Sequence, residues 1–492
     1  MNDIGHSTEA TDDLPAALSA RRKARIRALA DGQAADRDSW IDRNVYFHQD
    51  EGRYMRFLVP KGLKVLEIGC GTGRLLAALA PARGVGLDLS ENMVAVARCN
   101  HPHLEFIVGD IEDGKTFAKL NGPFDVIIMS DTMGSLDDCQ ATLKHLHALS
   151  APQTRVVLSY YSKLWEPFLW LAERLGAKMP QEEQNWLSTR DLAALLDLAD
   201  FETIKIEWRQ LLPRRLLGLG TLVNRYLAPL PILRRACLRT YVVARPRRGQ
   251  AVAHASTSVV IPCRNEKGNI EPAIRRLPRF CDDLEVIFVE GHSRDGTYEE
   301  CLRVKAAYPD RDIKVLRQDG VGKANAVHLG MAAARGDFLM ILDADLTVSP
   351  ESLPKFYEAL AEGRGDFVNG TRLVYPMERG AMRFLNFWAN RSFALIFSWL
   401  LNQRFTDTLC GTKALTRLQY RRLVAGRDYF GDFDPFGDFD LIFGASKLNL
   451  KIVEVPIRYV DRRYGETQIS RFRHGWMLLR MVVFAFRKLK AP

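Results

Sequence analysis

Phe338-Leu-Met-Ile-Leu-Asp-Ala-Asp345 joins an apolar run to two carboxylates that are one residue apart. The run predicts a buried strand, and because side chains alternate along a strand, Asp343 and Asp345 should point the same way at its C-terminal end. Paired carboxylates supply the oxygen ligands that Mg²⁺ or Mn²⁺ prefers. A metal held there would neutralise a diphosphate, so the segment favours transfer of a group from a diphosphate donor. Two solvated loop carboxylates are the alternative, and the flanking sequence has to decide.

The 492 residues are too many for one hydrophobic core, and 47% hydrophobic with 26% charged side chains is a globular composition. Apolar runs predict a first set of strands at residues 64–68, 84–87, 104–108, 124–129, 154–160, 203–208 and 238–243. A second set is predicted at 257–262, 285–289, 313–316, 338–342, 367–370 and 450–459. Helical stretches separate the strands, which indicates two α/β domains of doubly wound sheets. We expect a polar, partly disordered N-terminus over 1–40, a first domain over 41–245, a linker over 246–256 and a second domain over 257–492.

The positive charge is concentrated in one part of the chain. The formal net charge is +10, yet no Asp or Glu occurs between Trp208 and Asn265, where there are eleven arginines. Over residues 209–239 these arginines alternate with apolar side chains, which predicts a basic amphipathic insertion that lies on an anionic membrane surface rather than in a nucleic-acid groove. A solvated arginine-rich face beside a hinge is the alternative.

Two further segments are apolar but too short to cross a membrane. Residues 392–403 form an apolar run directly after Arg391, and residues 476–490 predict an amphipathic C-terminal helix with basic residues. The eight cysteines show no zinc-type spacing, and the acidic N-terminus has no secretory core. We therefore expect a cytoplasmic protein that is peripheral at the inner membrane face, and the oligomeric state is left open.

A glycine-rich turn follows the first predicted strand of the first domain. Glu67-Ile-Gly69-Cys-Gly71-Thr-Gly73 lets the backbone approach a ligand and opens a helix. This VLEIGCGTG segment resembles the class I S-adenosylmethionine-dependent methyltransferases, which have a Rossmann-like seven-stranded fold. The resemblance implies that Glu67, Gly69, Gly71 and Gly73 line the methionine part of the cofactor, Asp88 the ribose, and Asp110 with Ile111 the adenine. The glycines stand at every second position, which disfavours a dehydrogenase.

The sequence gives less information about the methyl acceptor than about the cofactor. Asp131 follows the fourth predicted strand, where a group facing the acceptor would lie, and a helix-capping role is the alternative. Asn-Pro-Pro-Tyr is absent at this position, so the usual signature for methylating an exocyclic or amide nitrogen is missing.

The second domain carries four motifs in order, VVIPCRNE from Val259, EGHSRDGT from Glu290, the segment ending in Asp345, and YGET from Tyr464. Together they resemble inverting family 2 glycosyltransferases with the GT-A fold, and in particular polyprenyl-phosphate sugar synthases such as dolichol-phosphate mannosyltransferases. The resemblance implies a nucleotide-sugar site formed by Pro262, Arg264, Asn265, Glu266, Glu290 and Asp343, with Asp343 and Asp345 as metal ligands. Glu290-Gly-His-Ser replaces the usual Asp-Asp-Gly-Ser, which leaves the nucleotide open.

Several charged residues are candidates for the phosphates and the acceptor. Lys323 follows a glycine loop and would bring a cation to the phosphates, or simply start a helix. Asp440, with Asp438 beside it, fits the place of the acceptor-side acid in the family and is a catalytic candidate. Arg462 and Arg463 precede the Gly-Glu segment, where they would clamp a phosphate or remain solvated.

The sequence therefore predicts a bifunctional enzyme. One half would move a sugar from a nucleotide donor to a polyprenyl phosphate or a membrane glycolipid or glycan, using Mg²⁺ or Mn²⁺. The other half would methylate a related small molecule or glycan intermediate with S-adenosylmethionine. The alternative is a glycosyltransferase whose methyltransferase-like domain only binds or docks, and nucleic acid is not an expected partner.

Overall fold

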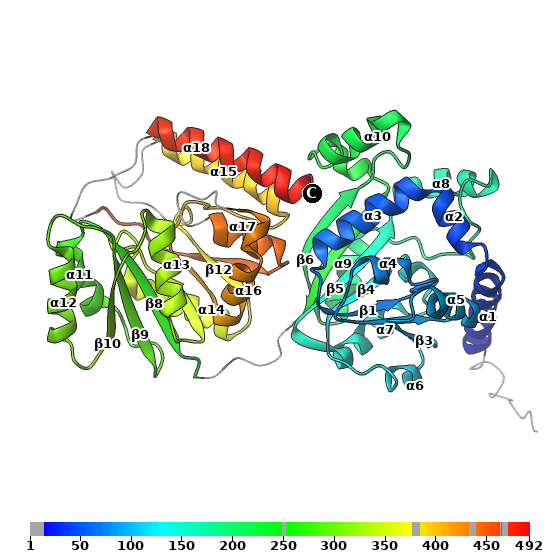
Figure 1. Ribbon diagram of the computed structural model, residues 1–492, viewed down its shortest axis with the longest axis horizontal. Helices are drawn as coiled ribbons and strands as arrows, with labels where there is room; N and C mark the ends of the chain where they lie inside the picture. Colours follow the sequence, from blue (N-terminus) through cyan, green and yellow to red (C-terminus); the bar gives the residue numbers. More distant parts are fainter. Residues whose placement is uncertain are drawn as a thin grey trace, which may run out of the picture. The chain divides into compact units, whose positions relative to one another are not determined.

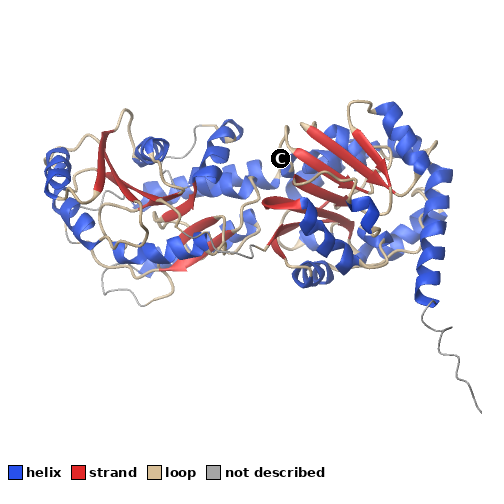
Figure 2. Ribbon diagram, turned by 90° about the horizontal axis from the view of Figure 1, so that it is seen from below, coloured by secondary structure: helices blue, strands red, loops and turns tan. Residues whose placement is uncertain are grey.

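The computed structural model describes residues 14–247, 252, 254–375, 384–431, 439–462, 464 and 471–492, without the side chains of 14–17, 384–389 and 471–475. Asp438 and Arg463 lie outside these residues. Contacts divide the chain into two compact units, 1–247 and 248–491. In each unit helices flank the strands of a sheet (Figures 1 and 2).

The first unit has a seven-stranded sheet in the order β3-β2-β1-β4-β5-β7-β6. Strand β7 runs antiparallel between β5 and β6. The strands are β1 (Lys64–Ile68), β2 (Arg83–Asp88), β3 (Glu105–Val108), β4 (Phe124–Ser130), β5 (Ser150–Tyr161), β6 (Phe201–Arg209) and β7 (Arg239–Pro246).

Helices precede and connect these strands. The α-helices are α1 (Leu14–Gln33), α2 (Arg37–Arg43), α3 (Val45–Leu58), α4 (Arg74–Ala78), α5 (Glu91–Asn100), α6 (Gly114–Phe117), α7 (Cys139–His145), α8 (Glu166–Arg174), α9 (Thr189–Leu198) and α10 (Leu219–Leu222). Short η segments are Met133–Ser135, Leu146–Leu149, Lys163–Trp165, Leu216–Gly218, Val223–Leu227 and Leu233–Ala236. The last three and α10 occupy the predicted basic insertion between β6 and β7.

The second unit also has seven strands, in the order β10-β9-β8-β11-β13-β12-β14. Strand β13 is antiparallel to both of its neighbours. The strands are β8 (Thr257–Cys263), β9 (Leu284–Glu290), β10 (Asp312–Arg317), β11 (Phe338–Ile341), β12 (Phe367–Thr371), β13 (Lys413–Thr416) and β14 (Ile452–Pro456). Its helices are α11 (Lys267–Arg276), α12 (Thr297–Ala307), α13 (Lys323–Ala333), α14 (Leu353–Ala361), α15 (Phe384–Leu401), α16 (Arg417–Ala425), α17 (Phe439–Lys447) and α18 (Arg471–Ala485), with η segments Pro350–Ser352, Arg427–Tyr429 and Phe486–Lys490.

Both sheets change direction of winding beside their first strand. Strand β1 pairs in parallel with β2 on one side and β4 on the other, and β8 pairs likewise with β9 and β11. At such a switch point the loops after the two central strands leave in opposite directions, and ligands bind in the crevice between them. The glycine turn, Asp131 and Asp343 all follow strands at these two points.

The prediction of two doubly wound α/β domains is confirmed, and the seven strands predicted before residue 245 are all present. One strand of the second sheet, β13, was missed, because Lys-Ala-Leu-Thr is short and carries a lysine that the structure buries completely. None of the described helices is long and apolar enough to pass through a bilayer.

Candidate active sites

The glycine turn of the first unit takes a backbone path that other residues avoid. Gly69, Gly71 and Gly73 have φ values of 77°, 52° and 76°, which is the left-handed region. A Cβ on Gly69 would also overlap the side chain of Thr132. The amide nitrogen of Gly71 lies 2.8 Å from Oδ2 of Asp88, to which it donates. The turn after β1 is therefore fixed to the carboxylate at the end of β2.

Two carboxyl groups lie at this turn, a half-buried one of Asp88 and a buried one of Glu67. Burial raises the pKa of Asp88, although the amide nitrogens of Ser90 and Gly71 donate to it. Burial, with the nearby charge of Glu51, raises the pKa of Glu67 well above its ordinary value. Oε2 of Glu67 has no hydrogen-bond partner among the described residues. Glu67 thus offers an unused polar atom beneath the turn.

A cavity of about 230 Å³ opens above the turn. Five predicted cofactor residues and the predicted acceptor residue line it, namely Gly69, Gly71, Asp88, Asp110, Ile111 and Asp131. Glu67 and Gly73 are not part of its wall. Gly73 instead caps the start of α4.

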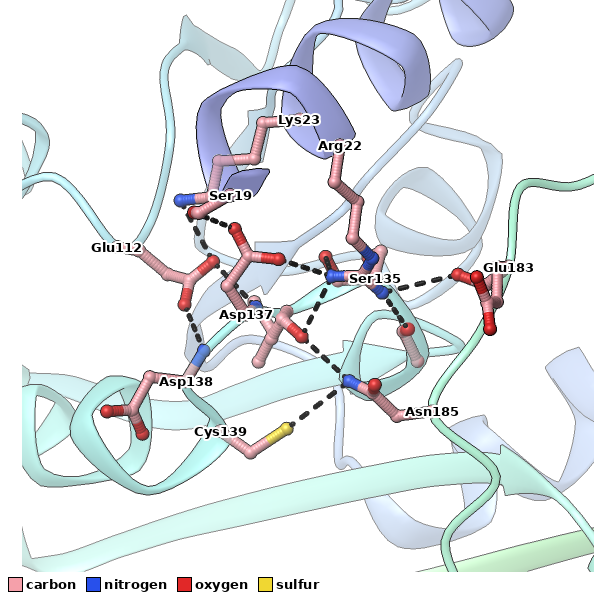
Figure 3. A network of polar contacts seen from close by, with 12 residues as sticks. Ser19, Arg22, Lys23, Glu112, Ser135, Asp137, Asp138, Cys139, Glu183 and Asn185 are labelled. Atoms are coloured by element: carbon pink, nitrogen blue, oxygen red, sulfur yellow. Dashed lines mark hydrogen bonds and ion pairs between the residues drawn. The ribbon is translucent and has the colours of Figure 1, made fainter. Parts of the chain in front are cut away.

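Helix α1 closes one side of this cavity, a contribution that the sequence did not reveal. Lys23 Nζ lies 2.5 Å from Asp110 Oδ2 and 3.0 Å from Glu112 Oε2. Beside it, Arg22 donates to the carbonyl oxygens of Ser135 and Glu183 and pairs with Asp137 (Figure 3). The N-terminal helix therefore bridges the loops that follow β3 and β4.

Asp131 sits in a buried charge network at the end of β4. The fully buried guanidinium of Arg239 lies 2.9 Å from Asp131 Oδ2 and 2.7 Å from Glu51 Oε1. Burial opposes ionisation of Glu51, but the Arg239 charge lowers its pKa to about 2. For Asp131 burial outweighs Arg239, and its pKa is raised.

The backbone of Asp131 is strained, and one of its carboxylate oxygens has no hydrogen-bond partner among the described residues. Its φ of 57° is unusual for a residue with a Cβ, a kind of strain that concentrates at functional sites. Its Oδ1 is buried without a hydrogen-bond partner among the described residues. Asp131 can therefore accept a proton or a hydrogen bond from a molecule in the cavity, which a helix-capping residue would not.

The second unit has its own cavity, of about 350 Å³, at the switch point beside β8. The predicted residues in its wall are Pro262, Arg264, Glu266, Lys323, Asp343, Asp345 and Arg462. Lys323 Nζ lies 2.6 Å from Asp343 Oδ1, and Arg462 Nη2 lies 2.7 Å from Asp345 Oδ2. Each carboxylate of the pair after β11 therefore has a cation of its own.

The charges set the protonation state of this wall. Burial alone would raise the pKa of Asp343, but the Lys323 ammonium lowers it below its ordinary value. Burial raises the pKa of Glu266, whose Oε1 lies 3.3 Å from Arg462 Nη1. The cavity presents an ionised Asp343 beside Lys323 and Asp345 beside Arg462, which suits a ligand made of phosphates and a metal.

Gly411 is a further element of this site that the sequence did not reveal. A Cβ at this position would overlap both the Asp343 carboxylate and, at 2.5 Å, Lys323 Nζ. Only a residue without a side chain leaves room for the pair. In the sequence Gly411 is a lone glycine in an irregular stretch, so it cannot be told apart from an ordinary turn glycine.

Asn265 and Glu290 stand beside the cavity without lining it. The Ser293 amide nitrogen donates to Glu290 Oε1 at 2.5 Å, and the Arg294 amide nitrogen donates to Asn265 Oδ1 at 2.9 Å. Asn265 thus holds the loop that follows β9 against the one that follows β8, whereas Glu290 holds the loop that follows its own strand.

Asp440 lies away from this wall on α17. His328 Nε2 and Arg427 Nε lie 3.0 and 3.2 Å from Asp440 Oδ2. The hydroxyl oxygen of Tyr420 lies within hydrogen-bond distance, 3.3 Å, of Nδ1 of His328. The carboxylate thus belongs to a polar cluster between α13, α16 and α17.

Each unit thus has a cavity at the switch point of its own sheet. Residues 40–206 match the family model of a methyltransferase domain, and residues 258–422 match that of glycosyl transferase family 2. The chain therefore combines a methyltransferase domain with a family 2 glycosyltransferase domain, as the resemblances predicted.

Curated relatives match the glycosyltransferase part. Glycosyltransferase AglD of Haloferax volcanii is 29% identical over 241 residues, which is 46% of this chain and 36% of that protein. Dolichol-phosphate mannosyltransferases of Pyrococcus furiosus and Saccharomyces cerevisiae are 34% and 36% identical over 119 and 121 residues, covering 24% and 23% of this chain. The chain spans 33% and 44% of the lengths of these two relatives.

Two solved structures each align with about half of this chain. A SAM-dependent methyltransferase of Thermotoga maritima aligns with 45% of this chain and 99% of its own, at 18% identity and a TM-score of 0.36. Glucosyl-3-phosphoglycerate synthase of Mycobacterium tuberculosis, solved with Mn²⁺ and uridine diphosphate, aligns with 50% of this chain and 86% of its own, at 19% identity and a TM-score of 0.37.

Proposed function

We propose that the second domain transfers a sugar from a nucleotide diphosphate donor to a polyprenyl phosphate or another membrane glycolipid. The observation that carries this proposal is the single cavity that gathers Asp343, Asp345, Lys323 and Arg462. Two carboxylates beside two cations suit a metal-bound diphosphate, whose charge grows as the sugar leaves. The names of the two mannosyltransferase relatives support the choice of a lipid phosphate as acceptor.

The carboxylates fit Mg²⁺ or Mn²⁺. Mg²⁺ is usually held by one or two protein carboxylates together with substrate phosphates and water, not by a full protein cage. Asp343 and Asp345 provide such a pair, and the described residues contain no group of three potential ligands. When bound, the metal would neutralise the diphosphate. Lys323 and Arg462 would move from the carboxylates to the phosphate oxygens.

The acceptor side is assigned to Asp440. A lipid phosphate is already an anion and needs no general base, whereas an alcohol acceptor does. With His328 and Arg427 next to it, Asp440 is better suited to orient a cationic neighbour toward a phosphate than to remove a proton. We propose Asp440 as a positioning residue in this reaction. Asp438 and Arg463, predicted near this region, lie outside the described residues.

The first domain, we propose, binds S-adenosylmethionine and methylates a related intermediate. The left-handed glycine turn and the Asp88 and Asp110 carboxylates, which line the cavity, fit a cofactor with an amine, two ribose hydroxyls and an adenine. The cofactor supplies an electrophilic methyl group. Asp131 then has two tasks, to orient the acceptor and to accept its proton.

We further propose that the protein works at the cytoplasmic face of a membrane. The segment between β6 and β7 exposes Leu217, Leu222 and Ile232 beside several arginines. Apolar side chains with basic neighbours bind an anionic bilayer surface.

A donor panel tests the sugar transfer. Membranes and labelled nucleotide sugars are incubated with Mg²⁺ or Mn²⁺ and either the parent protein or Asp345→Ala, and lipid extracts are separated by thin-layer chromatography. We expect a lipid-soluble label with one donor and its loss in Asp345→Ala, with the circular dichroism spectrum unchanged. No lipid-soluble label with any donor would refute the proposal.

Two measurements separate methyl transfer from mere binding. Calorimetry with S-adenosylmethionine should show binding that Asp88→Ala removes, since that carboxylate faces the cavity. Release of S-adenosylhomocysteine in the presence of the lipid product should follow. Binding without release under any condition would favour the docking-module alternative.

A further inference from the structure

We propose that a second cavity of the methyltransferase domain binds the methyl acceptor, and that this acceptor is a prenyl-phosphate lipid carrying the sugar hydroxyl to be methylated. The inference rests on the proposed function and names the substrate class for it. It makes the lipid product of sugar transfer the substrate of methyl transfer.

The second cavity has a volume of about 240 Å³ and adjoins the cofactor cavity. Arg37, Asp131 and Gln181 line both cavities. A molecule in the second cavity therefore meets Asp131, whose Oδ1 has no hydrogen-bond partner among the described residues. This is the geometry needed for an acceptor that meets a methyl donor.

Aromatic rings make up much of the wall of the second cavity. They come from five elements and comprise Trp40, Phe47, Tyr161, Trp165 and Phe168. Phe47 stacks on Tyr161 with ring centroids 6.2 Å apart, and Trp165 lies 5.6 Å from Phe168. Such a wall favours an apolar chain over a free sugar, because it removes the apolar surface of the chain from water.

The charged residues of the wall are mostly cationic. Arg37, Lys178 and Arg214 line the cavity, and among the described residues of the wall Asp131 is the one carboxylate. Lys178 Nζ forms an ion pair with Glu173 Oε2 at 3.2 Å, whereas Arg37 Nη1 donates to the sulfur of Met179. An apolar body with an anionic phosphate matches this combination of rings and guanidinium groups.

The apolar wall continues onto the surface. Phe168 lines the cavity yet is 62% exposed, and Leu171 and Leu175 on and after α8 are exposed beside it. The indole nitrogen of Trp165 donates to the carbonyl oxygen of Ala236 at 2.8 Å, which ties this region to the basic insertion. Figure 1 shows α8 and α10 on the same upper side of this unit. A lipid chain can pass from a bilayer surface into the cavity without crossing water.

The chemical step balances with groups already named. The sugar hydroxyl oxygen forms a bond to the methyl carbon of S-adenosylmethionine, and the bond from that carbon to sulfur breaks. The electron pair stays on sulfur, which leaves as a neutral thioether. The hydroxyl proton passes to Oδ1 of Asp131, so no oxidant or further reactant is needed.

Photolabelling tests the location directly. The full chain, with S-adenosylmethionine present, is irradiated with a farnesyl phosphate analogue that carries a diazirine in its chain, and labelled peptides are mapped by mass spectrometry. We expect label on residues 161–179, suppressed by excess farnesyl phosphate and not by mannose 1-phosphate. Phe168→Glu should weaken this labelling about tenfold, because a charge replaces an apolar contact.

Leu198→Glu is the matched control, since Leu198 is similarly exposed in the same domain but does not line the cavity. It should leave the labelling unchanged. Calorimetry with S-adenosylmethionine is run on each variant. Normal cofactor binding with label only outside residues 161–179, or with equal label in Phe168→Glu, would overturn this inference and leave the proposed function standing. Absence of cofactor binding in the parent protein would overturn both.

Discussion

Replacement of Arg239 by Met should destabilise the first unit strongly. The guanidinium has no exposed surface and contacts Glu51 Oε1 at 2.7 Å and Asp131 Oδ2 at 2.9 Å. Burial opposes ionisation of Glu51, yet the Arg239 charge, followed by the contacts of His48 and Ser130, holds its pKa at about 2 instead of 4.5. That difference corresponds to roughly 3 kcal/mol. It agrees with the loss of about 3–5 kcal/mol typical of a broken buried ion pair.

The loss should depend on pH in a defined direction. In the parent protein Glu51 contributes stability above its ordinary pKa, and this contribution is lost as pH falls from 4.5 toward 2. In Arg239→Met the burial of Glu51 is no longer opposed by a guanidinium but only by the smaller effects of His48 and Ser130, so we expect its pKa to rise. The folded state then binds more protons than the unfolded state, so the variant loses stability as pH rises. We expect a larger loss at pH 8 than at pH 5.5.

Urea unfolding followed by pulsed hydrogen–deuterium exchange and mass spectrometry reads both units in one experiment. Peptides of β4 and β5 should become exchangeable at lower urea in the variant, while peptides of β8 and β11 serve as the internal control. Adding Glu51→Gln to Arg239→Met should recover part of the loss, because one buried charge disappears. Equal urea midpoints for parent and variant at pH 8, or no recovery in the double variant, would refute this reasoning.

Three further predictions concern single side chains. Gly411→Ala should lower the rate of sugar transfer more than tenfold, because its Cβ would displace the pair of Asp343 and Lys323. Gly426→Ala is the control and should keep the rate, since its Cβ would make only ordinary contacts. Equal rates of the two variants in an initial-rate assay would contradict this prediction. Lys323→Met should raise the donor KM by about tenfold or more, the effect of one charge-assisted hydrogen bond, and an unchanged KM would count against its phosphate role. Glu67→Gln should be at least as stable as the parent at pH 8, since burial raises the pKa of Glu67 and the parent loses stability as pH rises above 4.5. A variant that is less stable than the parent by an amount that grows with pH would disprove the raised pKa of Glu67.

Sequence reasoning reached the strands and the residues that follow them. Apolar runs ending in glycine or aspartate mark buried parallel strands, which is why β1 begins and ends where predicted and Asp343 lies at the switch point. Local pattern was sufficient, because both the strand and its ligand group are contiguous in the chain.

What the sequence could not show is the set of contacts between distant segments. Lys23 reaches Asp110 across 87 residues, and Arg239 reaches Glu51 across 188. Arg239 looked like one more member of a basic surface stretch, whereas the sheet buries it as the centre of a charge network. The aromatic cavity was likewise hidden, because Trp40 and Phe168 belong to helices that no periodicity connects.

The position of β7 has a consequence for biosynthesis. It lies between β5 and β6 in the sheet, so β6 can join only after a strand that the ribosome makes later. The partner for the carboxylates of Glu51 and Asp131 arrives with that same strand. A nascent chain halted before residue 239 would lack the guanidinium that these two carboxyl groups contact, so the N-terminal half matures in a single late event, when its final segment emerges.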